Sequence, residues 1–136
     1  MGKKNEKNGF MRYLIDTNII IDHLRIGEEK ATNFLKEVER GKIKASISVI
    51  TEYELLISKK IFPSQKLIIQ KLLTLLPLIS ITPSIVQQAI KFSQKYQLGM
   101  VDSLIVATAF KTKSILVTRD KIFSNIKEVK IDSLGN

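Results

Sequence analysis

Cysteine is absent from this chain of 136 residues, and histidine occurs only once, at His23. Without cysteine the protein has no disulfide framework and no thiolate metal site, and a reducing cytoplasm fits this composition. We expect His23 on the surface of a helix rather than in a metal site. Any metal site is therefore expected to depend on oxygen ligands.

Long apolar runs are also scarce. Residues 1–9 are polar and no apolar run follows their lysines, which argues against a signal peptide. The most apolar stretch, residues 67–81, is interrupted by polar residues and a proline, so it does not predict a membrane span. With 44% hydrophobic residues the chain suits one globular domain. We expect a disordered basic tail over residues 1–10 and a single domain over residues 11–136.

Acidic residues are in the minority. The chain has 13 Asp and Glu against 22 Lys and Arg, which gives a net charge of +9 and a pI near 9.8. A surplus of this size in a small domain favours a polyanionic partner such as a nucleic acid, and a merely soluble basic surface is the alternative. Candidates for contacts with phosphate groups are Lys42, Lys44, Lys59, Lys60, Lys111, Lys113 and Arg119.

Apolar periodicity predicts alternating strands and helices. The expected strands cover residues 13–15, 44–48, 78–81, 114–117 and 129–131, and the expected helices cover residues 17–24, 28–40, 49–60, 64–75, 84–96 and 100–111. This alternation is typical of an α/β fold with a parallel sheet covered on both faces. Such sheets bind ligands at the carboxyl ends of their strands.

Acidic residues mark several of these strand ends. Asp16 directly follows the apolar run 13–15, and Asp120 comes shortly after the run 114–117. Asp102 lies in the first turn of a helix that is apolar nearly all round, where a carboxylate needs a partner. Each residue also has an ordinary structural explanation. Asp16 and Asp102 can cap helices, and Asp120 can be a plain turn residue.

A fourth acid comes from the helix expected at 49–60. Glu52 and Glu54 are two residues apart, so their side chains point about 200° apart on a helix. The apolar face of that helix centres near Tyr53 and Val49, with both glutamates beside it. Periodicity therefore does not choose between Glu52 and Glu54.

Together these acids predict a metal site. Strand ends and helix starts of a parallel α/β sheet meet at one edge, so the carboxylates would lie close together and repel one another. A cation would relieve that repulsion, and hard oxygen ligands without Cys or His select Mg²⁺ or Mn²⁺ over zinc.

Four segments of the chain resemble the PIN-domain ribonucleases, and most closely the VapC toxins of prokaryotic toxin–antitoxin pairs. They are LIDTNIIID at 14–22, SVITEYEL at 48–55, VDSLIVATA at 101–109 and VTRD at 117–120. Each segment is loose alone, but their order and spacing are specific. The resemblance implies a PIN-like three-layer fold with a central parallel sheet of about four to five strands flanked by helices.

The resemblance also implies a function and a site. The family's second acid precedes a leucine, which favours Glu54 over Glu52. The implied protein is a Mg²⁺-dependent endoribonuclease, with Mn²⁺ as a possible substitute, that leaves 5′-phosphate and 3′-hydroxyl ends. The implied catalytic residues are Asp16, Glu54, Asp102 and Asp120, of which Asp16, Asp102 and Asp120 would hold the metal. Substrate binding would fall to Thr17, Asn18, Thr118 and Arg119.

The implied partners are RNA, a cognate antitoxin and a second copy of the chain. We expect an antitoxin to place an Arg or Lys among the carboxylates and an apolar segment beside Ile20, Leu24 and residues 53–57. One position departs from the family pattern, because many relatives carry an Asp or His where this chain has Ile122. This departure puts more weight on Asp120 and leaves the number of metal ions open.

Other functions fit the residues less well. A haloacid-dehalogenase-type phosphatase needs a second aspartate two residues after the first, where this chain has Asn18. A phospho-receiver domain needs an aspartate after the expected strand 78–81, where the chain has Thr82, Pro83 and Ser84. The serious alternative is a catalytically idle PIN-like module that binds nucleic acid or a partner.

Overall fold

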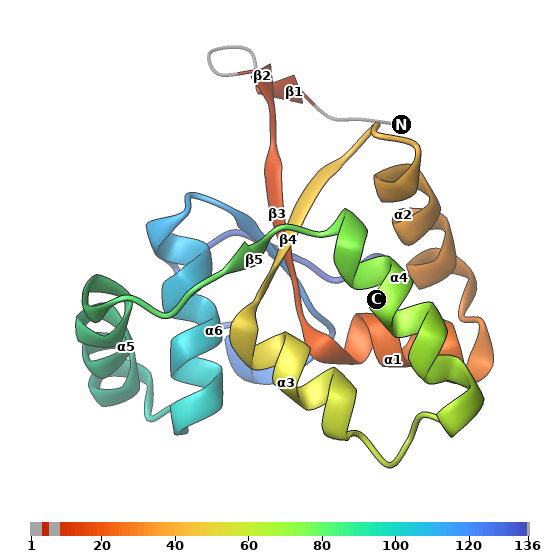
Figure 1. The fold of residues 1–136 in the computed structure, drawn as a ribbon. Coiled ribbons are helices and arrows are strands. Elements are labelled where there is room, and N and C mark those ends of the chain that lie inside the picture. The colour runs from red at the N-terminus through yellow and green to blue at the C-terminus, as the bar shows by residue number, and fades with distance from the viewer. Residues whose placement is uncertain (1–3, 6–8, 136) are drawn as a thin grey trace.

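A five-stranded parallel sheet runs through the centre of the protein (Figure 1). The computed structural model describes residues 4–5 and 9–135. Spatially adjacent strands are, in order, β5 (Leu78–Ile79), β4 (Lys44–Ser48), β3 (Arg12–Ile15), β6 (Ile115–Val117) and β7 (Ile131–Asp132), and every adjacent pair is parallel. The prediction of a parallel sheet of four to five strands is confirmed.

Helices cover both faces of this sheet. They are α1 (Thr17–Ile26), α2 (Glu29–Glu39), α3 (Val49–Ile57), α4 (Lys66–Leu75), α5 (Pro83–Tyr96) and α6 (Met100–Lys111). One apolar cluster joins the sheet to α1, α2 and α4, and a second joins it to α5 and α6. The result is the expected three-layer α/β architecture (Figure 1).

Residues 13–15 of β3, which follow the exposed Arg12, are apolar without interruption because both of their faces are covered. Successive side chains of a strand point to opposite faces. Tyr13 and Ile15 belong to the first apolar cluster, and Leu14 belongs to the second. Leu14 and Ile15 are fully buried, because a central strand of a covered parallel sheet has no solvent-facing side. This position fixes the residue after the strand, Asp16, at the centre of the sheet's carboxyl edge.

Several element boundaries differ from the predicted ones. Helix α3 ends at Ile57 rather than at residue 60, because the backbone of Ser58 is extended. A short 3₁₀ turn, Pro63–Gln65, precedes α4, so this helix begins at Lys66 rather than at the expected residue 64. The side chain of Gln65 accepts from the backbone N–H of Phe62 and donates to the carbonyl of Leu24. These contacts tie the α3–α4 connection to α1.

The two ends of the chain also refine the predictions. The last strand covers Ile131–Asp132 rather than 129–131, because Val129 is buried in the core instead of pairing in the sheet. The predicted tail, residues 1–10, contains a short antiparallel pair, β1 (Lys4–Asn5) with β2 (Gly9–Phe10). The remaining residues of that tail, 1–3 and 6–8, lie outside the described part of the chain.

No helix among the described residues combines the length and the apolar content that crossing a bilayer requires.

Candidate active site

The four expected acids lie at the carboxyl edge of the sheet. Two of them come after strands that end at this edge, and two lie in helices that begin there. Asp16 comes directly after β3, and its backbone N–H donates to the carbonyl of Val117 at the end of β6 (2.9 Å). Asp120 lies three residues beyond β6. Glu54 belongs to α3, which follows β4 without a loop, and Asp102 lies in the first turn of α6. Topology therefore gathers these side chains from four distant parts of the sequence.

Asp16 is held by two hydrogen bonds. One carboxylate oxygen, Oδ1, accepts from the backbone N–H of Thr17 (2.9 Å), so Asp16 caps α1. The other oxygen, Oδ2, accepts from the hydroxyl of Thr118 (2.7 Å). Burial raises the pKa of Asp16, and the negative charges of Glu54 and Asp120 raise it further against the lowering effect of these hydrogen bonds. The cap and the acidic cluster are thus two roles of one side chain.

Thr118 links Asp16 to Asp120. Its side chain is buried, its hydroxyl donates to Asp16, and its oxygen accepts from the backbone N–H of Asp120 (3.1 Å). Asp120 itself is exposed and accepts from the backbone N–H of Ile122 (3.1 Å). It therefore caps the short 3₁₀ turn Lys121–Phe123. The turn explanation of Asp120 is therefore correct locally, and it leaves the carboxylate beside the other acids.

Two threonines hold the glutamate of α3. The hydroxyl of Thr17 donates to Oε1 of Glu54 (2.6 Å), and it lies 3.3 Å from the hydroxyl of Thr51. An ionised carboxylate only accepts, so the single proton of Thr17 goes to Glu54. The buried hydroxyl of Thr51 is the second polar neighbour of the Thr17 hydroxyl. Thr51 is not among the site residues predicted from the sequence, where its only signal is its place one helical turn before Glu54.

This arrangement also shows how α3 is oriented. We predicted an apolar face near Tyr53 and Val49, and that prediction is wrong: Tyr53 is 64% exposed. The buried residues of α3 are Thr51 and Leu55. A helical wheel ranks faces by apolarity, whereas this helix buries a polar threonine because Thr17 offers it a hydrogen-bond partner.

Asp102 completes the acidic cluster. The cap of α6 is Gly99, with no side-chain hydrogen bond, so the explanation of Asp102 as a helix cap is wrong. Burial raises the pKa of Asp102, and the charges of Asp120 and Glu54 raise it further. Glu54 and Asp120 therefore act on both Asp16 and Asp102. We call Asp16, Glu54, Asp102 and Asp120 the acidic site.

The expected substrate-binding residues have different environments. Asn18 is exposed in the first turn of α1, whereas Thr17 is buried beneath the carboxylates. The guanidinium of Arg119 pairs with Glu28 and Asp22 (3.8 Å for Asp22), and its Nε donates to the carbonyl of Ser133 (3.2 Å). The charge of Arg119 is therefore already compensated within the chain.

The donor set of the acidic site suits a hard divalent cation. It consists of carboxylate and hydroxyl oxygens, and two of its carboxyl groups have raised pKa values that a nearby positive charge would lower. His23 is half-buried and hydrogen-bonds Thr32 through Nδ1 (2.7 Å), so it is less exposed than the surface position we expected. Within residues 4–5 and 9–135, no three acidic, Cys or His side chains form a ready-made metal-binding group.

The chain is similar to known proteins over most of its length. The family model of the PIN domain matches residues 13–129. The chain is 30% identical to a chain of a toxin–antitoxin complex from Klebsiella pneumoniae, with a TM-score of 0.75 over 90% of this chain and 97% of that one. Among curated protein sequences, none matches significantly.

Two further solved structures share the fold. The chain is 20% identical to one in VapBC2 from Rickettsia felis bound to a promoter DNA fragment, with a TM-score of 0.75 over 90% of this chain and 98% of that one. It is also 20% identical to one in VapBC-1 from nontypeable Haemophilus influenzae, with a TM-score of 0.73 over 93% of this chain and 100% of that one.

Proposed function

Since this chain belongs to the PIN-domain family, we propose that it is a Mg²⁺-dependent endoribonuclease and the toxin of a toxin–antitoxin pair. The observation that carries the proposal is the acidic site itself. The buried hydroxyl of Thr118 donates to Asp16, and the buried hydroxyl of Thr17 donates to Glu54. These hydrogen bonds hold two carboxylates that repel each other. A protein gains no stability from pressing like charges together, so such an arrangement favours a functional explanation.

Each residue has a distinct task in the proposed reaction. Asp16 and Asp102, supported by Asp120, would hold a divalent cation, with Mn²⁺ as a possible substitute for Mg²⁺. When bound there, the cation would supply positive charge to the scissile phosphate and would acidify the attacking water. Glu54, oriented by Thr17, would accept the proton of that water.

The resemblance to PIN-domain ribonucleases implies which bond of the phosphodiester breaks. The water oxygen bonds to phosphorus as the bond to the 3′ oxygen breaks. The leaving oxygen takes up a proton, which leaves 3′-hydroxyl and 5′-phosphate ends. Asn18 is exposed beside Asp16 and is a candidate contact for the RNA backbone.

The test is a cleavage assay on purified protein with total RNA and with single-stranded oligonucleotides. We expect cleavage with Mg²⁺ or Mn²⁺, none after chelation, and none for Asp16→Asn. Ligation-based sequencing of the new ends should find 5′-phosphates. RNA binding without cleavage under every metal condition would instead support the idle binding module.

Partner binding is the second part of the proposal. The matched structures are toxin–antitoxin complexes, and this chain exposes large apolar side chains along α3, the α3–α4 connection and α4. They are Tyr53, Leu56, Ile57, Phe62, Leu67 and Ile68. Ile20, which we expected in the partner groove, is fully buried and belongs to the core instead. An antitoxin would cover this apolar surface and place an Arg among the carboxylates, where it would replace the cation.

Calorimetry can test this mode of inhibition. We expect Mn²⁺ to bind the free protein and to bind the inhibited complex much more weakly. Unchanged metal affinity in the complex would leave steric blockage as the mode of inhibition.

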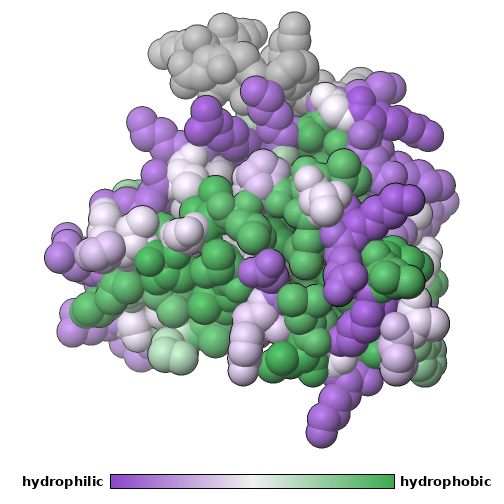
Figure 2. All heavy atoms as spheres, in the orientation of Figure 1, coloured by the Kyte–Doolittle hydropathy of each residue, from purple (hydrophilic) through white to green (hydrophobic). Residues whose placement is uncertain are grey.

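A homodimer is also expected. Figure 2 shows a wide apolar area over α5, α6 and β5. The exposed large apolar side chains of α5 and of the start of α6 are Val86, Ile90 and Met100. Analytical ultracentrifugation of the chain and of Ile90→Lys would test this surface, and a dimer that persists in the variant would place the interface elsewhere.

A further inference from the structure

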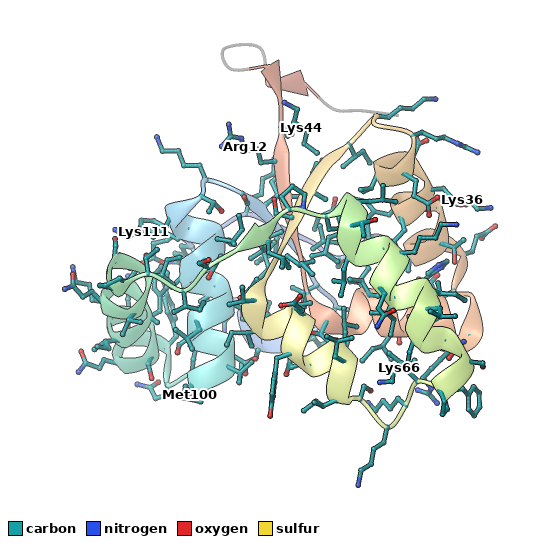
Figure 3. The ribbon with its side chains drawn as sticks, viewed as in Figure 1. Arg12, Lys36, Lys44, Lys66, Met100 and Lys111 are labelled. Atoms are coloured by element: carbon teal, nitrogen blue, oxygen red, sulfur yellow. The ribbon has the colours of Figure 1, made fainter. Side chains whose placement is uncertain are left out.

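Basic side chains gather at the amino edge of the sheet, opposite the acidic site. Arg12 begins β3 and Lys44 begins β4, and the two are register partners on adjacent strands. Lys111 ends α6, the helix that has Asp102 in its first turn. Figure 3 shows Arg12, Lys44 and Lys111 in the upper half of the molecule, whereas Met100, at the start of α6, lies at the bottom.

Three surface hollows at this edge each contain two or three cations. Arg12 and Lys44 line a hollow of about 550 Å³. The second, of about 480 Å³, is formed by α2 and the turn after it, and the third, of about 470 Å³, lies between the end of α6 and the start of β7. The basic residues of the second hollow are Lys36, Arg40 and Lys42. Those of the third hollow are Lys111, Lys113 and Lys130. All eight side chains are exposed, and we call them the basic edge.

Acidic neighbours do not neutralise the basic edge. The hollows contain two acids, Glu37 and Glu128. Glu128 is bound to Lys95 (2.9 Å), which lies outside the basic edge, and Glu37 pairs with Arg40 (3.6 Å). In the described part of the chain, Arg12 and Lys44 form no ion pair with an acid. The edge therefore keeps a surplus of positive charge.

Helix dipoles explain only some of these cations. The carboxyl ends of α2 and α6 lie at this edge, where a basic side chain is favourable. Arg12, Lys44 and Lys130 lie on or directly before strands, and strands have only small net dipoles. The positive charges of these three residues do not stabilise a helix end. Binding of a phosphate-rich ligand would explain why they are basic.

We propose that the basic edge binds the phosphodiester backbone of a folded RNA while another part of the same RNA enters the acidic site. This inference rests on the proposed ribonuclease function and names its substrate class. The carboxylates of the acidic site repel phosphates, so most of the affinity for RNA must come from elsewhere on the surface.

The distance between the edges sets the size of that RNA. Asp102 and Lys111 are nine residues apart on α6, which corresponds to about 14 Å along the helix axis. A single-stranded oligonucleotide of a few nucleotides seated in the acidic site would have to pass around the protein to reach the basic edge, because the sheet and the helices that cover it lie between the two edges. A folded RNA presents backbone to both edges, and contacts of Lys and Arg with phosphates position it without reading its sequence.

The experiment compares two double variants with the same change in charge. Lys44→Gln with Lys130→Gln removes two cations of the basic edge, and Lys71→Gln with Lys91→Gln removes two exposed cations of α4 and α5. Binding to a mixed tRNA pool is measured as a function of salt. We expect the first pair to lower the slope of log affinity against log salt by about two, roughly one per phosphate contact, and the control pair to leave it nearly unchanged.

Cleavage separates this inference from the proposed function. For the basic-edge pair, we expect KM for a folded RNA to rise several-fold, with kcat unchanged and with wild-type cleavage of a six-nucleotide oligonucleotide. Equal effects of the two pairs, or an unchanged salt slope for the basic-edge pair, would overturn the inference. If the wild type cleaves no RNA, the proposed function fails, and the binding measurement still decides whether the basic edge contacts RNA.

Discussion

Replacing Glu54 by Gln, with Glu52→Gln as its matched control, is the sharpest test of the acidic site. The two glutamates are neighbours on α3 and are both half-buried. Glu54 alone accepts the hydroxyl of Thr17 (2.6 Å) and acts on the pKa values of Asp16 and Asp102. A functional difference between the variants therefore reports on the site rather than on the helix.

The effect on stability should be small because two contributions oppose each other. A hydrogen bond to a charged acceptor contributes about 1.5–3 kcal/mol and a neutral one about 0.5–1.5 kcal/mol, so Glu54→Gln weakens the Thr17 contact by roughly 1 kcal/mol. Removing the negative charge of Glu54 also removes its repulsion of Asp16 and Asp102. This change stabilises the folded state and offsets part of the weakened hydrogen bond. We expect a net change within about 1 kcal/mol, or a Tm shift of about 3–5 °C for a chain of this size.

The effect on activity should be much larger. A general base contributes about 10²- to 10⁴-fold, which corresponds to about 2.7–5.5 kcal/mol of transition-state stabilisation. Single-turnover cleavage of a labelled RNA with Mg²⁺, together with thermal unfolding of each variant, measures both quantities. Activity of Glu54→Gln within threefold of the wild type, or a larger loss in Glu52→Gln, would refute the assignment.

Three further predictions test other contacts. Asp16→Asn should reduce cleavage at least 100-fold and change stability by less than about 1 kcal/mol, since the amide oxygen can still cap α1; a folded variant with wild-type cleavage would disprove its role. Thr51→Val should reduce activity about fivefold by removing the hydroxyl that the Thr17 hydroxyl contacts, a loss equivalent to about 1 kcal/mol, whereas Thr51→Ser should stay near wild type; equal losses in the two variants would point to packing instead. Hydrogen bonds from Lys95 and Tyr96 lower the pKa of Glu128 from 4.5 to about 2, so the stability they provide is present above pH 4.5 and lost as the pH falls through about 2. Urea unfolding should therefore find Glu128→Gln less stable than the wild type at pH 7, with the difference shrinking below pH 4.5, and a difference independent of pH would contradict this coupling.

The sequence alone determined the order of elements and the sheet. The runs at β4 and α6 are bounded as expected, because apolar periodicity and turn residues act over a few positions and are visible locally. The acids at the strand ends were visible for the same reason. Once the strands are known to be parallel, a residue that follows a strand must lie at the carboxyl edge.

Only the tertiary structure decided which side chains come together at the carboxyl edge of the sheet. Apolar periodicity left Glu52 and Glu54 equivalent and predicted the wrong buried face of α3. It contains no information about the contacts that Thr17 makes with Thr51 and Glu54 across the site. It also did not show that Arg119 is neutralised by Asp22 and Glu28, which come from distant positions. Hydrogen bonds and ion pairs depend on partners brought together by packing, so their pattern is absent from any single segment.

The distribution of charge follows the same division. Composition predicted a basic protein with a polyanionic partner, but it could not place the surplus. The parallel sheet separates the charges, because residues that begin strands and end helices lie at one edge and residues that end strands lie at the other. The sequence therefore determined how much charge the protein has, and only the fold decided that Lys44 and Asp102 lie at opposite edges.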